Sequence, residues 1–153
     1  MVTVVVASDH AGVEMKDALK PDLVALGLEV LDVGTHGADS VDYPDFGGLA
    51  AAAIRDGKAD LGLIVCGSGI GISIAANREP AVRAALCHDV TSARLSRLHN
   101  DANILALGAR LTGIETAREC VTAFFATAFE GGRHQRRVDK LGLLPTRTST
   151  PDT

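Results

Sequence analysis

A cysteine followed by a glycine-rich turn is the part of this sequence best suited to chemistry. Cys66 ends the apolar run from Leu61 to Val65, and Gly67, Gly69 and Gly71 follow it. The apolar run predicts a buried strand, and the small residues after the turn predict a helix. This order gathers backbone N–H groups at a helix N-terminus, which suits an anion or a developing oxyanion. The Cys66 thiol beside it can act as a nucleophile or as a general base.

Glycine turns also occur in nucleotide-binding loops and in purely structural turns. A Walker loop would end in Gly-Lys-Ser or Gly-Lys-Thr, which is absent here. A dinucleotide-binding fingerprint needs a glycine three places after the second one, where this chain has Ile72, so the fit is poor. A purely structural turn remains open, although strand-to-helix turns seldom carry three glycines.

The composition predicts one α/β domain without a general affinity for nucleic acid or membranes. The 153 residues are 46% hydrophobic but only 3% aromatic, so the core must consist mainly of Val, Ile, Leu and Ala. Such a core is typical of helices packed on a parallel sheet. The net charge of −4 disfavours nucleic-acid and membrane-surface binding. No apolar run approaches the ~20 residues of a membrane span.

The cysteines predict a reducing compartment. Cys66, Cys87 and Cys120 are an odd number without CxxC spacing, and no histidine pair stands at ligand spacing. Neither a disulfide framework nor a zinc site is therefore predicted. The N-terminus begins with a strand-like run and lacks a basic leader segment, so we expect no signal peptide and a cytoplasmic location.

Strands and helices are expected to alternate along the chain. Apolar, β-branched runs predict strands at 3–7, 29–33, 61–65, 82–87 and 104–107. Helices are expected at about 13–26, 45–56, 92–99, 112–129 and 133–144, besides the short one after the glycine turn. Pro21 should kink or split the first helix. Asp89 can cap one helix, and Thr112 with Glu115 forms a capping box for another.

This alternation predicts a doubly wound, Rossmann-like α/β fold with a mostly parallel five-stranded sheet and helices on both faces. Ligands bind such sheets beyond the carboxyl ends of the strands. Asp9 with His10, the 66–71 turn, and His88 with Asp89 all follow strands, so they should meet at one edge. His99 and Asn100 are candidates for the same edge.

A basic segment near the C-terminus offers a second candidate site. Arg133 and Arg137 stand four residues apart, on one face of a predicted helix. Two guanidinium groups on one face suit a phosphate or a carboxylate. Cations at a helix N-terminus are disfavoured by its dipole unless an anion lies nearby. A solvated basic face is the alternative.

Several candidates could equally have ordinary structural roles. Asp9 can simply cap the first helix, and His99 can be a surface or capping histidine. Arg110 follows the last strand and fits a surface role as well as ligand contact. Cys87 and Cys120 are expected to be inert core residues.

Five motifs together are similar to those of one enzyme family. They are Ser8-Asp9-His10-Ala11-Gly12, Asp42-Tyr43-Pro44, the segment from Cys66 to Gly71 with Ile74-Ala75-Ala76-Asn77, the segment from Leu95 to Asp101, and the segment from Gly132 to Arg137. The chain resembles the ribose-5-phosphate isomerase B / galactose-6-phosphate isomerase family from Val2 to about Leu144, in order and without obvious gaps.

The resemblance implies aldose–ketose isomerisation of a phosphorylated sugar through an enediolate, without a metal or organic cofactor. Position by position, the resemblance assigns the role of base to Cys66 and the role of ring-opening group to His99, with Asp9 and Ser68 nearby. One branch of the family has a glutamate where this chain has Ile72, so Cys66 is the only candidate base. The implied substrate contacts are Asp9, His10, Gly67, Ser68, Gly69, Ile70, Gly71, Asn100, Arg110, Arg133, His134 and Arg137. Among these, His10, Arg133 and Arg137 match the phosphate clamp, with His134 beside them, and the backbone amides from Gly67 to Gly71 match the oxyanion hole.

The resemblance also implies an active site shared between subunits. We expect an isomerase domain over residues 1–144, whose last helix (about 133–144) packs on a partner, and a flexible tail over 145–153. A homodimer or a dimer of dimers is predicted, without nucleic-acid or membrane partners. The favoured substrate is ribose 5-phosphate. Allose 6-phosphate, galactose 6-phosphate or a tetrose phosphate is the alternative, and a non-catalytic phosphate- or nucleotide-binding module is a more distant one. A thiol redox protein is disfavoured because Cys66 has no resolving cysteine close in sequence.

Overall fold

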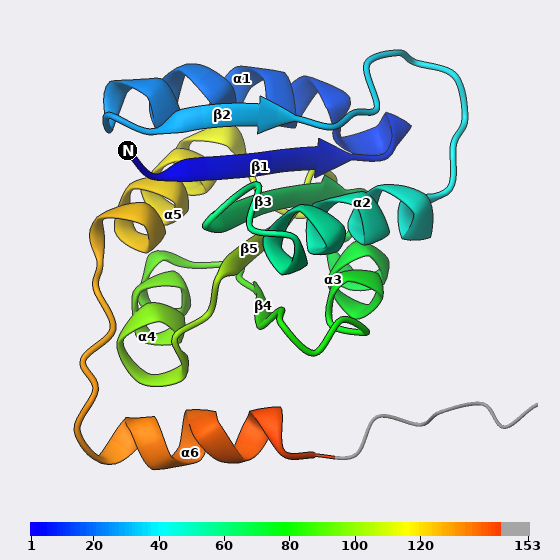
Figure 1. Cartoon of the computed structure of the whole chain (residues 1–153). Coiled ribbons are helices and arrows are strands. Elements are labelled where there is room, and N and C mark those ends of the chain that lie inside the picture. Colours follow the sequence, from blue (N-terminus) through cyan, green and yellow to red (C-terminus); the bar gives the residue numbers. More distant parts are fainter. Residues whose placement is uncertain (145–153) are drawn as a thin grey trace, which may run out of the picture.

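The computed structural model describes residues 1–144 and contains one five-stranded, fully parallel sheet (Figure 1). The strand order is β2-β1-β3-β5-β4. The strands are β1 (Thr3–Ser8), β2 (Glu29–Asp32), β3 (Leu61–Cys66), β4 (Ala84–Leu86) and β5 (Ile104–Gly108). The helices are α1 (Val13–Ala25), α2 (Tyr43–Arg55), α3 (Ile70–Ala76), α4 (Val90–Asn100), α5 (Ile114–Ala126) and α6 (Arg133–Gly142), with a 3₁₀ turn at His10–Gly12. The predicted doubly wound α/β fold is confirmed.

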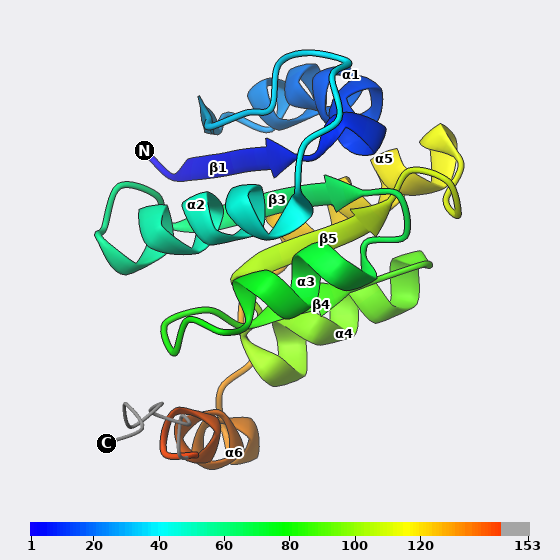
Figure 2. The ribbon, with the colours of Figure 1, turned by 90° about the vertical axis from the view of Figure 1, so that its right-hand side faces the viewer.

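Alternating side chains of the buried strands build one hydrophobic core on each face of the sheet. Val4, Val6, Leu63 and their neighbours pack against α1, α4 and α5. Val5, Ile64 and the residues in line with them pack against α2 and α3, which lie in front of the strands in Figure 2. The two layers of helices hold the strand ends, and the loops that follow them, in fixed positions.

The C-terminal helix stands apart from these layers. The chain leaves α5 through an extended connector and turns at Gly131 and Gly132, both with positive φ. α6 then lies beside α4, away from the sheet (Figures 1 and 2). The predicted tail over 145–153 lies outside the described residues.

Some predicted local details are confirmed and others are wrong. Asp89 caps α4, because its carboxylate accepts a hydrogen bond from the Ser92 N–H at 2.6 Å. The capping box at Thr112 is wrong: Gly113 precedes α5, no side chain among residues 1–144 caps that helix, and Thr112 is buried. Pro21 does not split the first helix, which runs continuously from Val13 to Ala25. Within residues 1–144, no helix is both long and apolar enough to span a membrane.

Candidate active site

The glycine turn after β3 holds Cys66 in a polar setting within the core. The thiol is 3% exposed, and its sulfur accepts a hydrogen bond from the Gly69 N–H at 3.1 Å. In the same turn, Ser68 Oγ accepts a hydrogen bond from the Ile70 N–H, also at 3.1 Å. Cys66 therefore lies against an amide that would stabilise negative charge on its sulfur.

Two glycines of this turn, Gly69 and Gly71, are required by its close packing. Gly69 has φ of +76°, and a Cβ there would lie 2.8 Å from the carbonyl carbon of Leu107. A Cβ on Gly71 would lie 2.6 Å from the Tyr43 ring. Packing alone thus accounts for part of the glycine pattern, and the same packing presents the amides beside Cys66.

Tyr43 is a neighbour of this turn that sequence reasoning did not select as a site residue. It is the chain's only tyrosine, is about half-exposed, and lies over Gly71 at the start of α2. The signal available in the sequence was its place in the Asp42-Tyr43-Pro44 motif, as the only tyrosine of the chain. Its position limits the space above the glycine turn.

Asp9 and His10 follow β1 at the same edge of the sheet. Asp9 is 7% exposed, and its Oδ1 accepts hydrogen bonds from the Ala11 and Gly12 N–H groups at 3.0 and 3.2 Å. Asp9 therefore has the capping role that was its structural alternative. His10 Nδ1 accepts a hydrogen bond from the Val41 N–H at 3.1 Å. Neutral His10 consequently carries its proton on Nε2, where it can donate to a ligand.

Arg110 completes this group of residues. Its N–H donates to the Gly67 carbonyl at 2.9 Å, and its side chain lies over the Gly67 backbone, about 3.4 Å from where a Cβ would stand. We name this group the cysteine half-site; its members are Asp9, His10, Cys66, Gly67, Ser68, Gly69, Ile70, Gly71 and Arg110. The predicted meeting of the β1 and β3 loops at one edge is confirmed. His88 and Asp89 follow the parallel strand β4 and lie at the same edge.

His99 and Asn100 do not lie at that edge, which corrects their expected placement. They end α4, and the next residue, Asp101, accepts a hydrogen bond from Arg83 Nε at its carbonyl, at 2.8 Å. Arg83 directly precedes β4, so this contact lies at the amino ends of the strands. The thiol lies at the other ends, because Cys66 pairs in register with Gly108, the last residue of β5. Over the five residues of β5, at ~3.3 Å per residue, the two edges are separated by about 16 Å.

α6 brings further predicted residues to this second edge. The His134 ring stacks on His99 with centroids 4.4 Å apart and 16° between planes. Burial lowers the pKa of His134, and the nearby His99 and Arg133 lower it further. His99, Asn100, His134 and Arg137 line a pocket of about 300 Å³. We name these four, together with the exposed Arg133, the histidine half-site.

The candidate residues of one chain therefore lie in two separate groups. The cysteine half-site has a thiol and the backbone amides of a glycine turn but no pair of arginines. The histidine half-site has imidazoles and guanidinium groups but no thiol. No Walker lysine accompanies the glycine turn, so a nucleotide-binding module gains no support from the geometry.

The family is decided by comparison with known proteins. A model of the ribose/galactose isomerase family matches residues 4–141, which is most of the chain. This chain belongs to the ribose/galactose isomerase family. The expected class of enzyme, an isomerase, is confirmed at this level.

Individual members of the family share both sequence and fold with this isomerase. Ribose-5-phosphate isomerase B of Escherichia coli is 43% identical over 139 residues, covering 91% of this chain and 93% of that protein. A D-erythrulose-4-phosphate isomerase of Pectobacterium atrosepticum is 38% identical, with 93% and 94% covered. The solved ribose-5-phosphate isomerase B of Clostridium thermocellum superposes with a TM-score of 0.90 at 48% identity, covering 93% of this chain and 96% of that one.

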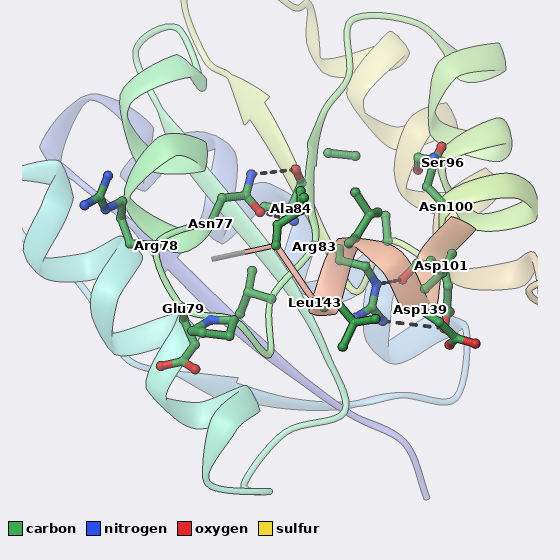
Figure 3. Close-up of a pocket in the computed structure, with 18 of the residues that line it drawn as sticks. Asn77, Arg78, Glu79, Arg83, Ala84, Ser96, Asn100, Asp101, Asp139 and Leu143 are labelled. Carbon is green, nitrogen blue, oxygen red and sulfur yellow. Dashed lines mark hydrogen bonds and ion pairs between the residues drawn. The ribbon is translucent and has the colours of Figure 1, made fainter. Parts of the chain in front are cut away.

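A larger cavity of the isomerase lies away from the thiol. It measures about 910 Å³ and is enclosed by the segment 77–85, the end of α4, and α6 (Figure 3). Its polar groups mostly bind one another: the Asn77 side chain exchanges two hydrogen bonds with the Ala84 backbone, at 2.7 and 3.0 Å. Asn100 lines this cavity as well as the smaller pocket. The cavity therefore borders the histidine half-site, between α6 and the sheet.

Proposed function

We propose that this protein interconverts ribose 5-phosphate and ribulose 5-phosphate through an enediolate. The observation that carries the proposal is the Cys66 sulfur at 3.1 Å from the Gly69 N–H, within a glycine turn, in a member of an isomerase family. A base next to oxyanion-stabilising donors is what proton transfer between two carbons that bear oxygen requires.

In the proposed reaction Cys66 acts as the base. Its thiolate removes the proton from C2 of the open-chain aldose, and the electron pair left behind forms the C1–C2 double bond of the enediolate. The oxygen that gains charge is stabilised by the backbone N–H groups from Gly67 to Gly71. The hydroxyl proton on the C2 oxygen moves to the C1 oxygen, which leaves the negative charge on the C2 oxygen. The thiol then returns its proton to C1, and C2 becomes the ketone carbon. No atom is lost or gained.

The other roles require both half-sites. His99 is proposed to open the furanose ring, with Asp9 and Ser68 beside the reacting carbons, and Asn100 to contact their oxygens. His10, Arg133 and Arg137 would clamp the phosphate, with His134 and Arg110 as further contacts. Because the half-sites lie at opposite edges of one sheet, we propose that each active site combines the cysteine half-site of one subunit with the histidine half-site of another. Such an arrangement requires at least a homodimer.

Relatives with other named substrates define the competing assignment. The relative in Pectobacterium atrosepticum is named for D-erythrulose 4-phosphate, so a tetrose phosphate is a specific alternative. Allose 6-phosphate and galactose 6-phosphate are longer substrates that the same chemistry would accommodate. All would use Cys66 in the same way and differ in the length of the pocket.

A coupled isomerase assay of the purified protein tests the proposal. Ribose 5-phosphate should be converted with kcat/KM of about 10⁴ M⁻¹s⁻¹ or more, and faster than the tetrose and hexose phosphates. Cys66→Ala should lower kcat by about 10²–10⁴-fold while sugar-phosphate binding persists. Cys87→Ala, which removes a buried thiol from outside the site, is the matched control. Undiminished turnover in Cys66→Ala would reject Cys66 as the base.

A further inference from the structure

The loop between β2 and α2 is joined at two points to the segment that carries His10. At one point, the Val41 N–H donates a hydrogen bond to His10 Nδ1 at 3.1 Å. At the other, Lys16 Nζ donates to the Thr35 carbonyl at 2.6 Å. Lys16 stands in the second turn of α1, shortly after His10 in the sequence. The two contacts therefore close a ring formed by the start of α1 and this loop.

Lys16 is the rigid end of this ring. Its charged side chain is fully buried, so the ammonium group depends on the partners that it has inside the protein. Besides the Thr35 carbonyl, it contacts Asp32 Oδ1 at 2.8 Å. The same Asp32 oxygen accepts the Gly34 N–H at 2.9 Å, and the Thr35 N–H donates to the Ser8 carbonyl at 2.8 Å. This end of the loop is thus fastened to β1, β2 and α1 together.

The middle of the loop has few contacts of its own. Residues 36–40 are exposed, and within residues 1–144 none of them takes part in a hydrogen bond. The loop extends beyond the carboxyl ends of β1 and β2 (Figure 1). The position of the Val41 N–H consequently depends on the two ends of the loop, one held by Lys16 and the other by the start of α2. With only the second end held, the exposed segment is free to pivot.

We propose that Lys16 is a positioning residue that acts through His10. By holding Thr35, it keeps the Val41 N–H on His10 Nδ1, and this contact leaves the proton of neutral His10 on Nε2 and fixes the direction in which the ring donates. That the Nε2 N–H is aimed at a phosphate rests on the proposed function. The link between Lys16 and His10 does not.

Lys20 provides a comparison within the same helix. Its Nζ contacts the other oxygen of Asp32, Oδ2, at 2.9 Å. Among residues 1–144 its ion pairs are with Asp17 and Asp32, and it makes no hydrogen bond to the loop. An effect that comes from pairing with Asp32 should therefore be shared by both lysines. An effect that passes through Thr35 should be specific to Lys16.

The first test compares hydrogen exchange at the Val41 amide in full-length Lys16→Met and Lys20→Met, measured by NMR without any sugar. Met retains an unbranched apolar side chain but lacks the ammonium group. We expect exchange at Val41 to be at least about tenfold faster in Lys16→Met, relative to the amides of β3, and unchanged in Lys20→Met. The β3 amides report global unfolding, so this ratio separates a displaced loop from a general loss of stability.

The second test is kinetic. Lys16→Met should raise KM for ribose 5-phosphate by about threefold or more with little change in kcat, because a hydrogen bond to a charged group contributes roughly tenfold in affinity and is here weakened indirectly. Lys20→Met should leave both constants unchanged. In a His10→Ala background, Lys16→Met should raise KM no further, since two residues that act through one contact are not additive.

Three results would overturn the inference. They are unchanged Val41 exchange in Lys16→Met relative to β3, equal acceleration in Lys16→Met and Lys20→Met, and a rise in KM that persists in the His10→Ala background. Faster Val41 exchange in a protein that does not convert ribose 5-phosphate would support the link and refute the proposed function alone. Lys16→Gln, which is neutral and shorter, should give the same acceleration and replaces Lys16→Met if that variant does not fold.

Discussion

Cys66 and His99 lie at opposite ends of the strands of the same parallel sheet, Cys66 at the carboxyl ends and His99 at the amino ends. Cys66 ends β3 and pairs in register with the last residue of β5, whereas His99 stands at the end of α4, just before β5 begins. One chain therefore cannot bring both to one small substrate without a large rearrangement. If both act on the same sugar, as we propose, they must come from different subunits.

Mixing two inactive variants should restore activity. Cys66→Ala and His99→Asn are each expected to be inactive, and subunit exchange between them gives hybrids with one intact site. Random pairing predicts recovery of roughly a quarter of wild-type activity. Turnover measured before and after exchange checks this. If exchange is verified by native mass spectrometry and no activity returns, the two residues act within one subunit.

Arg137→Ala should raise KM for the phosphorylated sugar by about tenfold or more, because a charge-assisted contact to phosphate contributes about 1.5–3 kcal/mol. kcat should change much less. Arg136→Ala, the exposed neighbour on α6, is the matched control and should leave KM unchanged. Steady-state kinetics with both variants distinguishes a phosphate clamp from a solvated basic face. Equal effects in the two variants would favour the basic face.

Gly69→Ala should destabilise the protein by about 2 kcal/mol or more. Alanine at positive φ costs about 1–2 kcal/mol, and its Cβ would press on the Leu107 carbonyl. Gly48→Ala provides a control of opposite sign, since a Cβ at that position of α2 would meet no atom of the described residues within 4 Å. It should stabilise the protein by up to about 1 kcal/mol. Urea unfolding measures both. A stable Gly69→Ala variant would show that the turn can relax.

Asp32→Asn should cost about 2–3 kcal/mol near neutral pH, because it leaves a buried ammonium without its counter-ion. Lys16 is fully buried, and its Nζ lies 2.8 Å from Asp32 Oδ1 and 2.6 Å from the Thr35 carbonyl oxygen. Asp17→Asn is the control: it removes an exposed partner of Lys20 and should cost less than about 1 kcal/mol. Urea unfolding of the three proteins gives the comparison.

The same pair predicts how stability depends on pH. Burial acts to raise the pKa of Asp32, but hydrogen bonds from Lys16, Lys20 and the Gly34 amide outweigh it, and the pKa is lowered. The contribution of ionised Asp32 to the free energy of unfolding is therefore fully present above about pH 3.9, the ordinary carboxyl pKa. It is lost as the pH falls through the lowered pKa of Asp32 in the folded state. The stability difference between wild type and Asp32→Asn should shrink in that acidic range. A difference independent of pH would exclude an ionic contribution.

Sequence alone determined the alternation of elements and the first half-site. Apolar, β-branched runs mark the central strands whatever surrounds them, and parallel strands must carry their following loops to one edge. That is why Cys66, Asp9 and His10 could be grouped from their spacing. Cap details depend on packing instead: Thr112 is buried, and Gly113 after it takes the N-cap position of α5, which begins at Ile114.

Only the tertiary structure decided where His99 lies and what it contacts. The eleven residues of α4 span about 16 Å at ~1.5 Å per residue, which returns the chain across the sheet to the opposite edge. The contact of His99 with His134 joins residues far apart in sequence and depends on how α6 packs against α4. Helical periodicity reports which face of a helix is apolar, but not which neighbour that face meets, and this is why the second half-site could not be read from the sequence.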